Sequence, residues 1–185
     1  MILGLDVSTS STGWSVLKES GELVEQGFIK LANIDGLFKK AKKVSIFLSK
    51  INIDHEIKKI YIEENLQSFR SGFSSAKTIS TLAKFNGIVS YISFIEFGID
   101  PEFLNVNSAR KSLGIKIARE KVCGKSTKNQ VFEWVRNSLK ESGYVWPVKT
   151  LKSGPRKGQT VFIDECFDIS DAYVIGRAGI EMNNS

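Results

Sequence analysis

Four acidic residues in this chain have the type and surroundings expected of a site for divalent metal ions. Asp6 lies within an apolar predicted strand over 2–7, where a carboxylate without a partner is costly to remove from water. Glu63 ends a later β-prone run, and Asp168 and Asp171 follow in a segment with helical periodicity. If the fold brings these four together, their oxygens form a ligand set that suits Mg²⁺ or Mn²⁺ and not zinc.

The spacing of the acids favours a two-metal site, although each acid also has a simpler interpretation. Asp168 and Asp171 are three residues apart, so on a helix they share one face with a rise of about 4.5 Å. Together with Asp6 and Glu63 they are enough to hold two ions about 3.5–4 Å apart, as nucleases and polymerases do. Alternatively, Asp168 caps the helix and Asp171 is a first-turn acid. Alternation along the strand does not decide between Glu63 and Glu64.

The loop after the first acid offers a different chemistry. Ser8 to Thr12 resembles the phosphate loop of the actin-like sugar kinases and chaperone ATPases, whose first strand also ends in an Asp. Those proteins enclose the nucleotide with a second lobe, which a chain of 185 residues cannot supply. The basic residue of their loop is replaced by Thr12-Gly13-Trp14. An ATP-binding kinase fragment is therefore the less favoured interpretation.

Positive charge is concentrated in one part of the sequence. Between Ser108 and Lys157 there are thirteen Lys and Arg and three Glu, a local net charge of +10 within a chain of net charge +6. The rest of the chain therefore carries −4. A basic segment joined to an acidic remainder is typical of polyanion binders, because each neutralised phosphate releases counterions. The alternative is a lysine-rich surface that is merely solvated.

The order of elements predicts an α/β fold with a mixed central sheet, in which three antiparallel strands precede parallel strands and helices flank the sheet. The expected elements are strands over 2–7, 13–18 and 22–30, a helix over 35–51, a strand over 59–63, a helix over 76–97, a strand over 103–106, helices over 108–113 and 125–141, a basic hairpin over 144–165, and a helix over 168–181.

Bulk properties predict a single intracellular domain. The length and the 42% hydrophobic content suit one domain over residues 1–185. Cys123 and Cys166 have no metal-binding spacing and predict free, buried thiols in a reducing compartment. The longest apolar stretch falls short of the ~20 residues of a membrane span, and no signal peptide is evident. We therefore expect a cytoplasmic protein that does not bind membranes.

The residues resemble the RuvC family of Holliday junction resolvases, within the ribonuclease H-like nucleases. The resemblance consists of four blocks that span nearly the whole chain in the family's order. These blocks are Gly4-Leu5-Asp6 with Thr12-Gly13-Trp14, then Ile62-Glu63, then Gly124 through Lys128-Asn129-Gln130-Val131, and Asp168-Ile169-Ser170-Asp171-Ala172. Each block is weak by itself, and their order and spacing make the match fairly specific.

The resemblance implies a metal-dependent, structure-selective endonuclease that resolves Holliday junctions or other branched DNA during recombination and repair. The family's catalytic acids, which are its metal ligands, fall on Asp6, Glu63, Asp168 and Asp171, with two Mg²⁺ ions per site and Mn²⁺ able to substitute. Its basic catalytic residue falls on Lys128. A junction with near two-fold symmetry implies a homodimer, with the helix over 76–97 as the candidate interface. Further DNA contacts are expected from Arg110, Lys111, Arg119, Lys121, Lys125, Phe69, Arg70 and Phe73.

Two departures from the bacterial pattern predict a divergent resolvase of phage or viral type. The bacterial first Asp is followed by Pro and Gly, whereas Val7 and Ser8 stand here. The bacterial aromatic residue three positions after the glutamate is replaced by Leu66, and Phe69 and Phe73 lie further along. Either phenylalanine is a wedge at the junction centre, or both belong to the core. A ribonuclease H-like nuclease acting on RNA or RNA:DNA hybrid, and a noncatalytic DNA-binding module, remain as alternatives.

Overall fold

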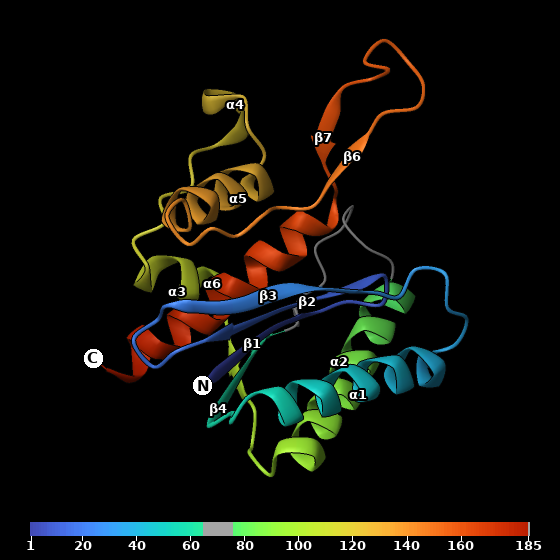
Figure 1. Cartoon of the computed structure of the whole chain (residues 1–185), viewed down its shortest axis with the longest axis vertical. Coiled ribbons are helices and arrows are strands. Elements are labelled where there is room, and N and C mark those ends of the chain that lie inside the picture. The colour runs from blue at the N-terminus through green and yellow to red at the C-terminus, as the bar shows by residue number, and fades with distance from the viewer. Residues whose placement is uncertain (65–75, 185) are drawn as a thin grey trace.

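A computed structural model describes residues 1–64 and 76–184 of the chain, and its centre is a five-stranded mixed sheet (Figure 1). The strand order is β3-β2-β1-β4-β5. Strands β1 to β3 pair antiparallel, whereas β4 and β5 extend the sheet in parallel with β1, which confirms the predicted mixed sheet. The strands are β1 (Ile2–Val7), β2 (Ser11–Leu17), β3 (Leu23–Lys30), β4 (Lys59–Glu63) and β5 (Glu102–Leu104).

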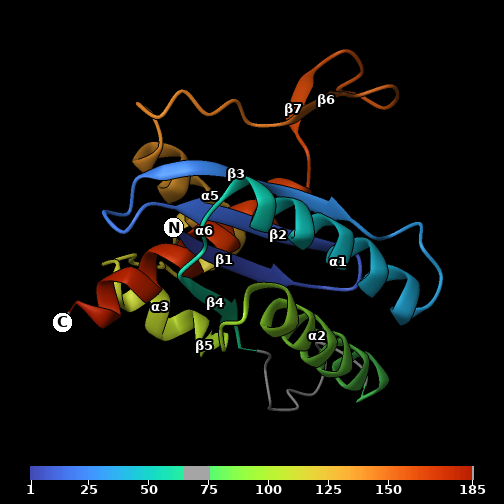
Figure 2. The ribbon, with the colours of Figure 1, turned by 60° about the horizontal axis from the view of Figure 1, so that its bottom comes forward.

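Helices cover both faces of this sheet and form a three-layered molecule (Figures 1 and 2). Helices α1 and α2 contact each other and lie on one face. Helix α6 packs along β1 and β2 on the opposite face, where α3 and α5 contact it. The helices are α1 (Leu37–Asp54), α2 (Ala76–Phe97), α3 (Val106–Ser112), α4 (Glu120–Cys123), α5 (Thr127–Ser138) and α6 (Glu165–Asn183). A separate hairpin of β6 (Val148–Thr150) and β7 (Thr160–Phe162) projects from the body.

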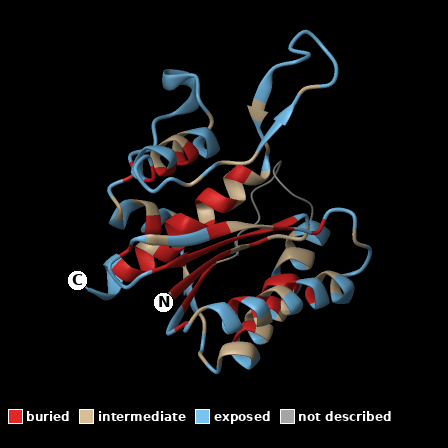
Figure 3. Cartoon of the chain, in the orientation of Figure 1, coloured by how far each residue is buried: buried red, intermediate tan, exposed pale blue. Residues whose placement is uncertain are grey.

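Strand alternation divides the core into two clusters, one on each face of the sheet (Figure 3). Leu3 and Leu5 of β1 are fully buried in the cluster with residues of α1 and α2. Ile2 of β1 and Tyr61 of β4 belong to the other cluster, with residues of α6. Because successive side chains of a strand point to opposite faces, residues of the same parity as Ile2 and Tyr61 face α6.

Helix α6 lies so close to the sheet that several contact positions accept only glycine. A Cβ at Gly13 of β2 would meet the backbone carbonyl of Asp168, and one at Gly4 of β1 would meet that of Ala172. The Ser15 hydroxyl donates a hydrogen bond to the Ala172 carbonyl at 3.0 Å. Backbone therefore packs directly on backbone, which brings the first turns of α6 down to the surface of β1 and β2.

The element order agrees with the sequence prediction, and the differences lie at element ends. Helix α6 begins at Glu165 with Asp164 as its N-cap residue, so the interpretation of Asp168 as a helix cap is wrong. Helix α3 begins at Val106, earlier than predicted, because the Asn105 side chain accepts hydrogen bonds from two backbone amides of its first turn. The short helix α4 was not predicted.

Helix α5 is shorter than its predicted range of 125–141, because the Ser126 hydroxyl caps its start and regular helix ends at Ser138. The prediction that both thiols are buried is correct for Cys166 and wrong for Cys123, which is exposed at the end of α4. Within residues 1–64 and 76–184, no helix is long and apolar enough to cross a membrane.

Candidate active site

Adjacent parallel strands place Asp6 and Glu63 side by side. Strands β1 and β4 pair in register from Ile2 with Lys59 up to Leu5 with Ile62, so the next positions are the two acids. Neighbouring strands lie about 4.8 Å apart. Both acids share strand parity with the residues that contact α6. The register therefore selects Glu63, not Glu64, as the acid on the face of Asp6, which alternation alone could not do.

Helix α6 supplies the other two acids to the same face of the sheet. Asp168 lies in its first turn and Asp171 one turn later, and the contact at Gly13 presses the backbone of Asp168 onto β2. The negative charges of Asp168 and Asp171 both raise the pKa of Asp6 and of Glu63. The four acids predicted from the sequence thus lie within electrostatic range of one another.

Burial raises the pKa of every acid in this group, and repulsion from neighbouring carboxylates adds to the rise for Asp6, Glu63 and Asp168. The pKa of Asp6 lies well above its ordinary value, first because of burial and then because of the other three carboxylates. Burial is also the largest cause for Glu63, whose pKa rises to about 7, and for Asp168, whose pKa rises to about 6. The pKa of Asp171 is raised by burial as well. The negative charge of the four carboxylates is therefore not fully neutralised by nearby positive charge.

Two basic side chains partly offset this negative charge. Lys128, in the first turn of α5, lowers the pKa of all four acids. Arg110 of α3 donates from Nη2 to Asp171 Oδ1 at 3.2 Å, with both side chains mostly buried. Its charge also lowers the pKa of Glu63. Arg110 was predicted only as a DNA contact, and its ion pair with Asp171 joins elements that are 61 residues apart in the chain.

The donor chemistry of the site fits a hard divalent cation. All four acids offer oxygen ligands, which Mg²⁺ and Mn²⁺ prefer, and a dication would relieve the repulsion that raises their pKa values. Among the described residues, no three His, Cys, Asp or Glu side chains already lie close enough together to hold one ion. Asp171 is engaged by Arg110. The residue types fit the metal, and the arrangement of the side chains is not that of a formed metal cage.

The loop from Ser8 to Thr12 is closed by its own hydrogen bonds. The Ser8 hydroxyl donates to the Ser11 carbonyl at 2.6 Å and accepts from the amides of Ser11 and Ser10 at 3.2 and 3.4 Å. Val7 pairs with Thr12, so the β1–β2 ladder continues up to this turn. A phosphate loop needs its amides free for the ligand. These contacts therefore count against the nucleotide-binding interpretation.

Other residues predicted to bind DNA lie on the side of the molecule formed by α3 to α5. Lys111, Arg119 and Lys121 are exposed on or beside α3 and α4, as a phosphate-binding surface requires. Lys125 is half-exposed and makes an ion pair of 2.8 Å with Glu133. The three remaining predicted contacts lie outside the described residues, and these are Phe69, Arg70 and Phe73.

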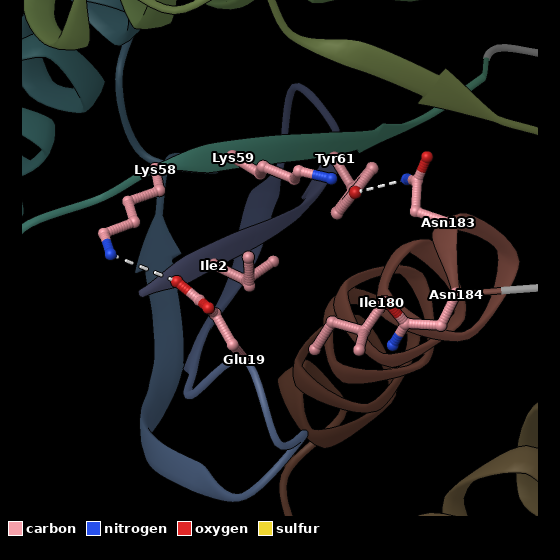
Figure 4. Close-up of a pocket in the computed structure, with 8 residues that line it drawn as sticks. All are labelled: Ile2, Glu19, Lys58, Lys59, Tyr61, Ile180, Asn183 and Asn184. Carbon is pink, nitrogen blue, oxygen red and sulfur yellow. Dashed lines mark hydrogen bonds and ion pairs between the residues drawn. The ribbon is translucent and has the colours of Figure 1, made fainter.

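Two cavities in the described residues lie away from the acids. A cavity of about 230 Å³ opens among Ile2, Lys59 and Tyr61, where Asn183 donates a hydrogen bond to the Tyr61 hydroxyl at 2.6 Å (Figure 4). Ile2 is four residues before Asp6, so the cavity lies about 13 Å away, at the opposite end of the strand. The second cavity lies between β3 and α1. None of the four acids lines either of these two cavities.

Solved structures with similar folds come from RuvC and a related resolvase. Thermus thermophilus RuvC in complex with a Holliday junction substrate is 14% identical, with a TM-score of 0.65, covering 99% of this chain and 94% of that chain. A second T. thermophilus RuvC structure is 16% identical, with a TM-score of 0.62 and coverage of 99% and 95%. The yeast mitochondrial Holliday junction resolvase Ydc2 is 14% identical, with a TM-score of 0.55 and coverage of 99% and 78%.

No protein-family model and no curated protein sequence matches the chain significantly. The structural likeness extends over nearly the whole chain, and the sheet order and flanking helices account for it. With its four acids gathered on the α6 face of this sheet, the chain has the fold of the RuvC-type Holliday junction resolvases.

Proposed function

We propose that this protein is a divalent-metal-dependent endonuclease that cuts four-way DNA junctions and related branched DNA. The main support is the gathering of four carboxylates with raised pKa values around one lysine, on a RuvC-type fold. The T. thermophilus RuvC with this fold was solved with a Holliday junction substrate. The basic segment over 108–157 supplies the charge that a branched polyanion needs.

The residues divide the chemistry among them. In this proposal Asp6, Glu63, Asp168 and Asp171 hold two Mg²⁺ ions, which supply activation of the attacking water and stabilisation of the leaving 3′ oxygen. Lys128 offsets the negative charge of the scissile phosphate. A charge-assisted hydrogen bond from Arg110 fixes the orientation of the Asp171 carboxylate.

Histidine has no part in this proposed reaction. The single histidine of the chain, His55, lies just before β4, at the opposite end of that strand from Glu63. Its Nε2 is 3.4 Å from a carboxylate oxygen of Glu25. Proton transfer in the proposed reaction therefore falls to water and the carboxylates.

A comparison of substrates tests the proposed function. A synthetic four-way junction, a linear duplex of the same sequence, an RNA:DNA hybrid and a single-stranded RNA are incubated with the protein, with and without Mg²⁺. We expect Mg²⁺-dependent cuts in the junction, at paired positions on two strands, and at least tenfold slower cutting of the linear duplex. Faster cutting of the hybrid would move the assignment to a ribonuclease H-like activity, and binding without any cutting would leave only a DNA-binding module.

Helix α2 carries the surface that we propose for a homodimer. Tyr91, Phe94 and Ile95 lie at i, i+3 and i+4 and therefore share one face, where their exposed fractions are 65%, 39% and 61%. Three large apolar side chains exposed together are unusual on a monomer. A junction with two-fold symmetry requires two active sites, which a dimer supplies.

Changing Ile95 to Glu should convert the dimer to a monomer in light scattering, because a charge in a closely packed apolar contact is costly to desolvate. Ile46→Glu is the matched control, since Ile46 of α1 is 64% exposed and carries the same chemical change on a different surface. The control should remain dimeric. If the wild-type protein bound to a junction is always a monomer, coordinated cleavage by two sites is contradicted.

A further inference from the structure

The hairpin of β6 and β7 stands out from the body of the molecule (Figures 1 and 2). Its strands pair antiparallel, with Val148 opposite Phe162 and Thr150 opposite Thr160. The turn is closed by two backbone hydrogen bonds, from Leu151 to the Gln159 carbonyl at 3.0 Å and from Gly158 to the Leu151 carbonyl at 2.8 Å. Hydrogen bonding thus extends beyond the two short strands towards the tip.

The hairpin carries only positive charge. Residues 148–162 contain four basic side chains and no acidic one, and all four are exposed. Lys149, near the base, lies 3.7 Å from the Asp164 carboxylate. Lys152, Arg156 and Lys157, near the tip, make no ion pair with any described residue. Three unpaired cations on a narrow projection form a contact surface for a polyanion.

An aromatic cluster fixes the base of the hairpin to the body. The Phe162 ring packs edge-on against Phe132 of α5, with 5.1 Å between centroids. The Arg136 guanidinium carbon lies 4.6 Å from the Phe162 centroid. Phe132 also packs edge-on against Trp146, at 4.9 Å. The Ile163 amide donates to the Pro147 carbonyl at 3.3 Å, which joins the two ends of the hairpin. The charged tip is therefore held by a packed base.

The hairpin leads directly into the active site. Only Asp164, the N-cap residue, separates Ile163 from helix α6, whose first turn contains Asp168. The six extended residues from Gly158 to Ile163 span up to ~20 Å between the tip and the base of the hairpin. Successive phosphates of one strand are about 3.4 Å apart along a duplex axis, so this reach corresponds to about six base pairs.

We propose that the hairpin is a DNA-binding arm, whose tip contacts the phosphates of a duplex arm several base pairs from the bond that the acid cluster cleaves. This inference rests on the proposed function for the position of the cleaved bond. The contact itself requires only charge complementarity between the tip and the duplex backbone. Because the contacts are to phosphates, the arm adds affinity in any base sequence.

A salt titration of DNA binding tests the arm. The triple variant Lys152→Ala, Arg156→Ala, Lys157→Ala is compared with wild type, by fluorescence anisotropy on a four-way junction in EDTA. Each lost phosphate contact lowers the slope of log affinity against log salt by about 0.9, so we expect a decrease of about 2.7 and at least tenfold weaker binding near 0.15 M salt. The matched control removes three exposed lysines of α1, with the changes Lys39→Ala, Lys42→Ala and Lys50→Ala.

A second measurement locates the contact along the DNA. Uncharged methylphosphonates placed four to eight base pairs from the cleaved bond should weaken binding of wild type and leave the triple variant unaffected. The proposed arm would be contradicted if the hairpin variant had the salt slope of wild type. It would also be contradicted if the α1 control lost as much of the slope as the hairpin variant. The circular-dichroism melting temperature shows whether either variant is unfolded. The two proposals can fail separately. If the protein cuts no junction, the proposed nuclease function is wrong. The DNA-binding arm still stands in that case if the salt slope decreases in the hairpin variant and not in the α1 control.

Discussion

Replacing Asp6 with Asn should reduce cleavage of a four-way junction by roughly 10³-fold or more, while junction binding changes by only a few-fold. Asp6 lies at the centre of the acid cluster, since each of the other three carboxylates raises its pKa. Asn keeps the shape and removes the negative charge that a bound dication needs. The measurement is single-turnover cleavage at saturating protein and Mg²⁺, with anisotropy for binding.

Asp54→Asn makes the matched control, because Asp54 is an exposed acid at the end of α1, a helix on the face of the sheet opposite α6 (Figure 1). Cleavage should be unchanged in this variant. Full activity of Asp6→Asn would refute the assignment of the acid cluster as the active site. Equal loss of cleavage and of folding would leave the cluster without a demonstrated catalytic role, so the stability of each variant is measured in parallel.

The raised pKa values predict the direction in which stability changes with pH. Glu63, with a pKa of about 7 against an ordinary 4.5, holds a proton in the folded state that the unfolded chain releases. Metal-free wild type should therefore lose stability as the pH rises from about 4.5 to about 7. Asp6→Asn removes one repelling charge, so the metal-free variant should be at least as stable as wild type at pH 7.5. Mg²⁺ should raise the melting temperature of wild type more than that of the variant.

Replacing Gly13 with Ala should destabilise the protein by about 3 kcal/mol or more and abolish cleavage in the molecules that still fold. The added Cβ would meet the Asp168 backbone, which cannot move away as the end of a flexible side chain can. Helix α6 would have to lift from β2, and Asp168 would move with it. Urea unfolding measures the first effect, and single-turnover cleavage measures the second.

Gly87→Ala is the matched control for this prediction. Gly87 lies within helix α2, and an added Cβ there contacts nothing within 4 Å. Because alanine favours helix more than glycine does, the change should raise the free energy of unfolding by about 0.5–1 kcal/mol. Urea unfolding is measured with the association state checked by light scattering. If Gly13→Ala were as well tolerated as Gly87→Ala, the close approach of α6 to β2 would be contradicted.

Local sequence patterns are enough to predict the mixed sheet and to mark three of the four acids that the fold brings together. A charged residue inside an apolar strand marked Asp6, and the i, i+3 spacing marked the pair on α6. The choice of Glu63 over Glu64 needed the strand register, in which Leu5 pairs with Ile62. Family resemblance had given the same answer without a physical reason.

Contacts between distant segments were not predictable from local patterns. The ion pair of Arg110 with Asp171 depends on how α3 packs against α6, and a basic residue in a basic segment gives no sign of such a partner. The cluster of Phe132, Trp146 and Phe162 similarly joins α5 to the hairpin. The predicted start of α6 at Asp168 is three residues too late, since Cys166 is already buried on the same helix face as Ile169 and Tyr173.

The packing of α6 on β1 and β2 also has a consequence for the order of events at the ribosome. Asp6 and Glu63 belong to strands that are synthesised early, whereas Asp168 is added 162 residues after Asp6. At 5–20 residues per second, roughly 10–30 s of translation separate the synthesis of Asp6 from that of Asp168. In the proposed nuclease, a nascent or prematurely terminated chain that lacks α6 has no complete site. Under that proposal, unfinished chains would have no nuclease activity.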